Sequence, residues 1–107
     1  MKVATVATLL TLAGMSISSI ASAAPNGAAL YVDKTCTACH GKDGKKTLMP
    51  DYPKIAGQNK AYVEKQMLDI KSGARKNGNS VAMAGVMGLV SEAEIKVLAD
   101  YISKMKP

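Results

Sequence analysis

The stretch Cys36-Thr37-Ala38-Cys39-His40 decides how the rest of this chain is interpreted. Its C-x-x-C-H spacing is the attachment pattern of a c-type haem. Each of the two thiols adds to one vinyl group of the porphyrin, and the histidine that follows binds the iron through an imidazole nitrogen. The chain has two cysteines and one histidine, so the motif uses all of them. The sequence therefore predicts one covalently attached haem c.

Three other uses of these residues fit the surrounding sequence less well. A thioredoxin-like C-x-x-C needs a βαβ context, and no β-rich run flanks Cys36. A structural zinc site needs four ligands, whereas the motif supplies three, namely Cys36, Cys39 and His40. A plain disulfide would leave His40 without a role.

The N-terminus has the pattern of a cleaved export signal. Lys2 gives a positive start, residues 3–20 are apolar apart from Thr, Ser and Gly, and Ala21-Ser22-Ala23 forms an A-x-A cleavage site. We expect cleavage after Ala23, so that residues 1–23 are a signal peptide and 24–107 a monohaem domain in the periplasm. The alternative is an uncleaved membrane anchor, which the Ser and Thr content of the run disfavours.

The composition suits a small fold that depends on a prosthetic group. The chain contains no Phe and no Trp. A domain this short buries little surface and usually needs a covalent cross-link or a cofactor to be stable. Its 14 Lys and Arg residues against 8 Asp and Glu give a formal charge of +6. That excess suits acidic protein partners or anionic membrane surfaces. Nucleic acid is not expected, because no basic stripe is interleaved with aromatic residues.

Helical patterns mark three segments of the mature chain. The first runs from Asn26 to Lys34, the second from Lys60 to about Ser72, and the third begins at an S-x-x-E capping box of Ser91 and Glu94. We expect loops over residues 41–58 and 75–80, and a linker of small residues over 81–88. No alternating strand pattern occurs. The fold class is all-α, with three main helices and loops wrapped around one haem.

The second axial position of the iron has methionine candidates, whose thioether suits haem iron and raises its potential. Met49 follows the motif too closely, Met67 lies in an apolar helical stripe, and Met105 is near the C-terminus. Met83 and Met87 lie among small residues that let the backbone approach a flat macrocycle. The residues alone leave these two equal, with an open iron as a third alternative.

Six runs of the chain together carry a family resemblance. They are Gly27-Ala28-Ala29-Leu30-Tyr31, Cys36-Thr37-Ala38-Cys39-His40-Gly41, Tyr52-Pro53-Lys54-Ile55-Ala56-Gly57-Gln58, Tyr62-Val63-Glu64-Lys65-Gln66-Met67, Met83-Ala84-Gly85 and Leu98-Ala99-Asp100-Tyr101-Ile102. With these runs the mature chain resembles the small class I c-type cytochromes of the bacterial periplasm. The likeness is greatest to the monohaem c-553-like proteins and to single domains of the cytochrome c4 group, whose members carry two such domains.

The resemblance implies the roles of several residues. In relatives the axial methionine lies seven residues before the apolar residue that precedes the helix-capping serine. That residue is Val90 here, which implies Met83 as the iron ligand and Met87, the runner-up, as a packing residue. The backbone carbonyl of Pro53 would accept a hydrogen bond from the other ring N–H of His40 and so fix its tautomer.

The same likeness implies a haem environment beyond the iron ligands. Ile55 would pack on the haem, and Gly27 would let the first helix cross the last one closely, near Tyr101. Three further residues are candidates for contacting the haem propionates, namely Gln58, Tyr62 and Arg75.

The expected function is electron transfer rather than enzymatic catalysis. With His40 and Met83 on the iron, no axial site is left for a substrate. The protein would be a monomer that shuttles single electrons between respiratory redox partners, which it meets transiently through their acidic docking surfaces. One alternative is a haem subunit of a larger dehydrogenase or oxidase. Another is a gas- or peroxide-binding protein, if Met83 leaves the iron easily.

Overall fold

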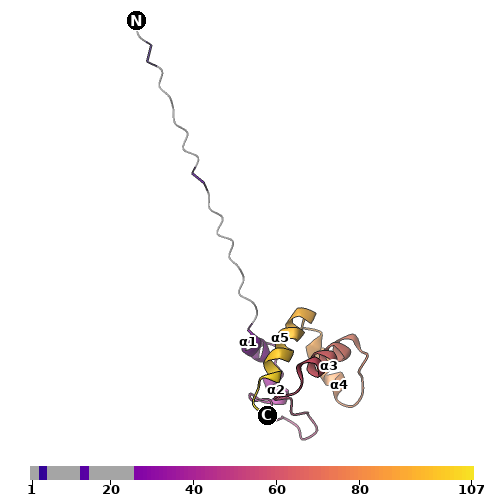
Figure 1. Cartoon of the computed structure of the whole chain (residues 1–107). Coiled ribbons are helices and arrows are strands. Elements are labelled where there is room, and N and C mark those ends of the chain that lie inside the picture. The colour runs from indigo at the N-terminus through magenta and orange to yellow at the C-terminus, as the bar shows by residue number, and fades with distance from the viewer. Residues whose placement is uncertain (1–2, 5–12, 15–25) are drawn as a thin grey trace.

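The computed structural model describes residues 3–4, 13–14 and 26–107. All regular structure in these residues is helical (Figure 1). The elements are α1 (Gly27–Asp33), α2 (Cys36–His40), α3 (Lys60–Ser72), α4 (Ser80–Met87) and α5 (Glu92–Ser103). The all-α fold class is confirmed, whereas the expected cleavage after Ala23 lies outside the described residues.

The three helices expected from the sequence begin at side-chain caps. The side chain of Asn26 accepts a hydrogen bond from the Ala28 N–H at 2.8 Å, and that of Asn59 accepts one from the Tyr62 N–H at 3.0 Å. Helix α5 begins at the expected capping box. Such caps satisfy backbone N–H groups that the first helical turn leaves without partners. Helix α3 ends at Gly73, whose φ of 83° is the left-handed conformation that a glycine adopts at low cost.

Helix α4 corrects the sequence-based expectation of a linker over residues 81–88. The segment Ser80–Met87 is helical, and its residues are nearly all small or apolar. Such a segment has no polar face to alternate with an apolar one, so periodicity gives no signal there. Alanine and methionine nevertheless favour helix on intrinsic propensity.

Helix α5 forms the centre of the core and contacts both α1 and α3, while α4 packs on α3 (Figure 1). Its buried face consists of Ile95, Leu98, Ala99 and Ile102. Gly27 permits the close crossing of α1 and α5, because a Cβ placed there would lie 2.5 Å from the Cβ of Tyr101. The rings of Tyr31 and Tyr101 then lie 5.6 Å apart between the helices. Within the described residues no helix has the length and apolar character needed to cross a bilayer.

Candidate functional site

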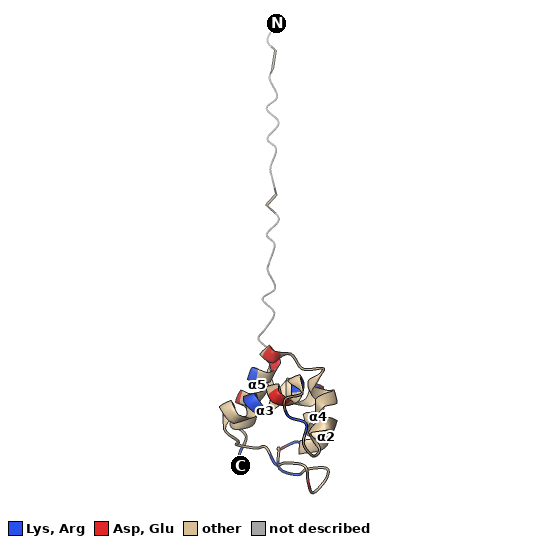
Figure 2. Ribbon diagram, turned by 90° about the vertical axis from the view of Figure 1, so that its right-hand side faces the viewer, with Lys and Arg blue, Asp and Glu red and all other residues tan. Residues whose placement is uncertain are grey.

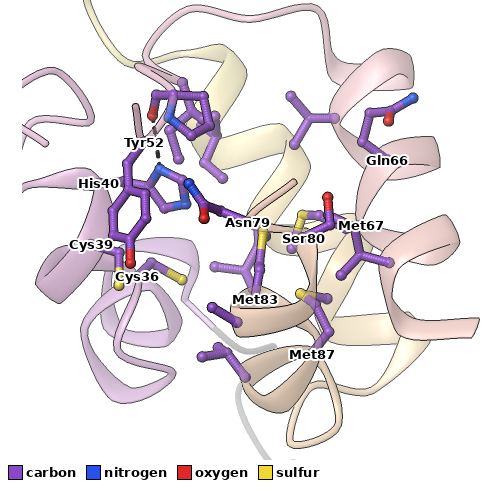
Figure 3. Close-up of a pocket in the computed structure, with 18 of the residues that line it drawn as sticks. Cys36, Cys39, His40, Tyr52, Gln66, Met67, Asn79, Ser80, Met83 and Met87 are labelled. Carbon is purple, nitrogen blue, oxygen red and sulfur yellow. Dashed lines mark hydrogen bonds between the residues drawn. The ribbon is translucent and has the colours of Figure 1, made fainter. Parts of the chain in front are cut away.

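Helix α2 carries the motif and is set at its angle to α1 by Thr35. This residue has a φ of 63°, which is uncommon for a β-branched side chain. The left-handed conformation ends α1 and redirects the chain into α2 within two residues. Cys36, Cys39 and His40 consequently lie along one wall of a cavity (Figure 3).

That cavity has a volume of about 460 Å³ and lies between α2 and the following loop on one side and α3 and α4 on the other. Its volume is in the range of small-molecule and cofactor sites. Every site residue expected from the sequence lines it: Cys36, Cys39, His40, Pro53, Ile55, Gln58, Tyr62, Arg75, Met83 and Met87. Residues more than forty positions apart in the chain thus meet around one space.

The ring of His40 is buried and fixed by a hydrogen bond. Its Nδ1 lies 2.9 Å from the backbone oxygen of Pro53. A carbonyl oxygen only accepts, so Nδ1 must donate and carry the proton. The other ring nitrogen, Nε2, then keeps a free lone pair, which is the state in which imidazole binds a metal.

The two cysteines are free thiols at the edge of the cavity. Burial, together with a smaller contribution from the charge of Cys39, raises the pKa of the Cys36 thiol to about 11. At neutral pH the Cys36 sulfur therefore stays protonated in the chain without a cofactor. Both sulfurs lie on the His40 side of the cavity (Figure 3), where they can form thioethers with a single macrocycle.

Met83 and Met87 both project from α4 but differ in burial. Met83 is half-buried and extends into the cavity (Figure 3). Met87 is 1% exposed and belongs to the hydrophobic core. Met87 is therefore held by packing on several sides, while the Met83 thioether faces the cavity.

Arg75 reaches the cavity without a carboxylate partner among the described residues. Its guanidinium donates to Gln66 Oε1 at 3.1 Å and to Asn77 Oδ1 at 3.3 Å. Tyr62 and Gln58 also line the cavity, but Tyr62 is 53% exposed. The side chain of Gln58 accepts a hydrogen bond from the backbone N–H of Asn59.

Two polar residues at the cavity were missed by sequence reasoning. Asn79 Nδ2 donates to Asp51 Oδ2 at 2.5 Å, and both residues line the cavity. Asn79 also stands directly before α4 but makes no side-chain cap there. Its position before a helix would have been the only sequence signal, and that signal requires α4 to be recognised first.

The loop after α2 is tied to the core beneath the motif. The buried hydroxyl of Tyr31 donates to the Gly41 oxygen at 2.7 Å, and burial raises the pKa of Tyr31 to about 12. The hydroxyl therefore keeps its proton and remains a donor. Gly41 has a φ of 83°, and a Cβ at this position would overlap the Lys46 carbonyl. A glycine is required where the loop leaves α2.

These residues fit a covalently attached haem. The cavity is lined mainly by apolar side chains, with two thiols and an oriented imidazole on one wall and a thioether on the other. Thiols attach the macrocycle, while imidazole and thioether are established axial ligands of haem iron.

Comparison with known proteins gives one family and several relatives. The family model described as Cytochrome c matches residues 24–106. Cytochrome c-552 of Acidithiobacillus ferridurans is 39% identical over 101 residues, which are 92% of this chain and 43% of that protein. Cytochrome c-554(548) of Halomonas halodenitrificans is 38% identical over 72 residues, which are 67% of this chain and 86% of that protein.

The described fold also resembles a solved structure. The crystal structure of reduced recombinant cytochrome c4 from Pseudomonas stutzeri matches with a TM-score of 0.66 and 33% sequence identity. The match covers 75% of this chain and 46% of that one. The chain therefore spans less than half the length of its c-552 and c4 relatives.

Proposed function

The chain belongs to the cytochrome c family and carries a covalently bound haem c, and on that premise we propose that it is a periplasmic carrier of single electrons with His40 and Met83 as its axial ligands. The observation that carries this proposal is the pairing of an oriented imidazole and an inward-facing thioether across one cavity. When bound, the haem supplies a reversible one-electron couple of its iron.

The protein side chains would hold the haem and tune the potential of its one-electron couple. Cys36 and Cys39 attach the macrocycle, and Ile55 packs against it within the apolar lining. The hydrogen bond from His40 to the Pro53 carbonyl fixes the imidazole and increases its basicity. Because apolar side chains line much of the cavity and the His40 ring is already oriented, the site would need little reorganisation when its charge changes.

Met83 is preferred over Met87 because of its surroundings. Met87 also lines the cavity, but it is 1% exposed and packed in the core, so that a shift toward a metal in the cavity would disturb that packing. A buried methionine that vacates its place leaves a void, which costs about 2–5 kcal/mol in protein cores. The half-buried Met83 already extends into the cavity and needs no such change.

Arg75 is the proposed partner of a haem propionate. Its two hydrogen bonds to amide oxygens hold the guanidinium at the cavity without neutralising its charge. A carboxylate entering the cavity would complete a charge-assisted pair with it. Gln58 and Tyr62 line the same cavity and are proposed as further polar contacts.

We propose that substrate chemistry is absent. Acid–base catalysis on a haem-bound ligand needs a titratable group on the open side of the iron. His40 is the chain's single histidine, and its ring is engaged with Pro53. The cavity wall formed by α4 contributes the thioethers of Met83 and Met87 and small or apolar residues, and no second histidine is present for this role.

The proposed location and partners follow from the ends and the charge of the chain. Residues 1–23 would act as a signal peptide removed after Ala23, which leaves 24–107 as a monomeric domain in the periplasm. The formal charge of +6 suits brief encounters with redox proteins whose docking surfaces are acidic.

A second candidate is a haem subunit of a larger dehydrogenase or oxidase. It is favoured by the length of the c-552 and c4 relatives, of which this chain matches less than half. A domain of the same kind therefore works elsewhere as part of a longer protein. Isolation of the chain in a stable complex with a dehydrogenase or oxidase would support this candidate over the free carrier.

The deciding experiment compares the visible spectra of the wild-type protein, Met83→Leu and Met87→Leu. The two variants make the same change on the same helix, one turn apart. We expect a low-spin reduced spectrum and a weak far-red sulfur–iron band when oxidised, with that band lost in Met83→Leu alone. The reduced protein should bind carbon monoxide only in Met83→Leu.

Two results would contradict the proposal in different ways. Loss of the band in Met87→Leu alone would exchange the roles of the two methionines and keep the electron carrier. A high-spin wild-type spectrum with ready carbon monoxide binding would instead indicate an open iron and a ligand-binding function.

A further inference from the structure

The loop over residues 41–59, between α2 and α3, exposes two large apolar side chains at its tip. Leu48 is 67% and Met49 48% exposed. Neither side chain lines the haem cavity. An adjacent pair of exposed apolar residues on a small protein is a common sign of an interaction site, whereas single exposed residues are not.

The same loop carries more lysines than carboxylates. It holds four lysines, namely Lys42, Lys45, Lys46 and Lys54. The ion pairs found within residues 26–107 involve lysines of other segments: Lys34, Lys60, Lys65 and Lys104. The four loop lysines are therefore unpaired in the described structure, and they recur along the loop below α2 (Figure 2).

The two carboxylates of the loop are occupied by other partners. Asp43 accepts hydrogen bonds from the backbone N–H groups of Lys45 and Lys46, at 2.9 and 3.2 Å. These bonds hold the pKa of Asp43 below its usual value. Asp51 accepts from the side chain of Asn79. Neither carboxylate is found in an ion pair with a loop lysine within residues 26–107, so the four lysines keep a net positive charge on the loop.

The loop tip is also held in one conformation. The Leu48 N–H donates to the Cys39 oxygen at 3.0 Å, which fastens the tip to the haem-attachment helix. The Thr47 hydroxyl and the Tyr52 N–H both donate to the Met49 oxygen at 3.0 Å. The apolar pair is thus presented by a fixed turn, and binding through it would cost little ordering entropy.

We propose that this tip, Lys45 to Met49, docks the protein on an anionic lipid bilayer. Leu48 and Met49 would enter the headgroup region while the loop lysines meet lipid phosphates. Lysine near an anionic surface and shallow apolar side chains are the two components of peripheral membrane binding. A stably bound protein is the less suitable occupant of this tip, because the cores of protein interfaces favour Arg and aromatic residues and are depleted in Lys.

Docking at the tip would bring the haem-attachment helix close to the bilayer, since Leu48 is hydrogen-bonded to Cys39. The proposal goes beyond the electron-carrier function and does not depend on which methionine binds the iron. The bound protein would then reach membrane-embedded redox partners by diffusing along the bilayer surface rather than through the surrounding solution.

The test is co-sedimentation of the haem-loaded exported protein with vesicles, followed by haem absorbance. Vesicles of phosphatidylglycerol and phosphatidylcholine are compared with phosphatidylcholine alone, at low and high salt. We expect binding to the anionic vesicles at low salt and release at high salt. Binding to both kinds of vesicle, as a retained N-terminal anchor would give, contradicts the proposal.

Two pairs of variants separate the loop from net charge. Lys45→Gln with Lys46→Gln should weaken binding roughly twenty-fivefold, since each lysine at an anionic surface is worth about fivefold. The control Lys76→Gln with Lys96→Gln removes the same charge from exposed positions in other segments and should change binding by less than about twofold. If the two double variants lost vesicle binding equally, binding would depend on the overall charge of the protein and not on the loop, and the proposal would be overturned.

Insertion of the tip is tested with Leu48→Trp, which gives the chain its only tryptophan. We expect its emission to shift to the blue on anionic vesicles, whereas Leu89→Trp, at another exposed position, should not shift. Vesicle binding without a shift at position 48 would overturn the proposed apolar contact. The proposal would also be overturned if the loop variants bound vesicles as the wild type does but changed electron exchange with a protein partner. An unchanged haem spectrum in each variant shows that the fold and the iron ligands are intact.

Discussion

The side-chain amide of Asn79 donates a hydrogen bond of 2.5 Å to the carboxylate of Asp51, and this bond joins the two walls of the haem cavity. Asp51 lies two residues before Pro53, whose carbonyl orients His40. Asn79 precedes α4, the helix that carries Met83. The bond therefore connects the segment that fixes one proposed axial ligand to the helix that presents the other.

Asn79→Ala should loosen the proposed Met83 ligand without displacing it. A net contribution of about 1 kcal/mol for the lost hydrogen bond corresponds to a roughly fivefold larger population with the iron open. We expect cyanide to bind the oxidised variant about fivefold faster than the wild type, with an unchanged resting spectrum. Asp51→Asn keeps an oxygen acceptor and should stay close to the wild type. Equal cyanide rates in all three proteins would show that the bond does not act on the ligand.

Gly27→Ala should destabilise the fold by separating α1 from α5. The new Cβ would lie 2.5 Å from the Cβ of Tyr101, a distance that requires the helices to move. Overpacking of this kind costs about 1–3 kcal/mol. Denaturant unfolding of the haem-loaded protein measures the loss.

Gly85→Ala is the matched control for that substitution. Gly85 lies inside α4, and a Cβ there would meet nothing within 4 Å. Because alanine favours helix over glycine by about 1 kcal/mol, this variant should be slightly more stable than the wild type. If both variants shift the unfolding midpoint in the same direction, the close helix crossing is not the cause.

The sequence predicted those parts of the fold that depend on neighbouring residues. The capping residues Asn26, Asn59 and Ser91 act on backbone groups within three positions, so their patterns can be read along the chain. The sequence did not predict helix α4, because the apolar residues of this helix face both the cavity and the core. A helix that is apolar on both its cavity side and its core side lacks the alternation of polar and apolar residues from which a helical period is recognised.

The site was predictable in its chemistry but not in its contacts. Cys36, Cys39 and His40 are identified by side-chain type and spacing alone. The acceptor for His40 is a backbone carbonyl, which any residue could supply, so only a family resemblance indicated Pro53. The Asp51–Asn79 bond joins positions 28 apart, and no local pattern predicts such a pair before the fold is known.

The capping box of α5 should make stability depend on pH in the acid range. Glu94 accepts a hydrogen bond from the Ser91 backbone N–H at 3.0 Å, and this bond lowers its pKa from the usual value of 4.5. A carboxyl with a lowered folded-state pKa stabilises the fold above its unfolded pKa. That contribution is lost as pH falls through the folded value.

Glu94→Gln should therefore remove part of the acid destabilisation. We expect the unfolding midpoint of the wild type to fall more steeply below about pH 4.5 than that of the variant. Glu92→Gln changes a glutamate of the same first turn that lies outside the box, and it should keep the wild-type slope. Parallel pH profiles for wild type and Glu94→Gln would assign the acid sensitivity to other groups.

Lys71→Met should weaken α4 at its C-terminal end. The Lys71 ammonium donates to the Met87 oxygen at 3.0 Å from the neighbouring helix α3. It is a second donor to a carbonyl that also accepts from the Val90 N–H at 3.2 Å, and its charge complements the helix dipole. Methionine keeps most of the aliphatic stem but removes the charged donor, so that the carbonyl keeps only its bond from the Val90 N–H. We expect a loss of about 1–2 kcal/mol and faster hydrogen exchange confined to the amides of α4.

Lys65→Met gives the matched comparison on the same helix. Lys65 forms an exposed ion pair with Asp69 at 3.1 Å, and pairs of this kind contribute about 0.3–0.5 kcal/mol. Its loss should leave the α4 amides unchanged. If Lys71→Met is no more destabilising than Lys65→Met, packing on α3 alone holds α4. The lysine bond to its C-terminus would then have no part in placing Met83.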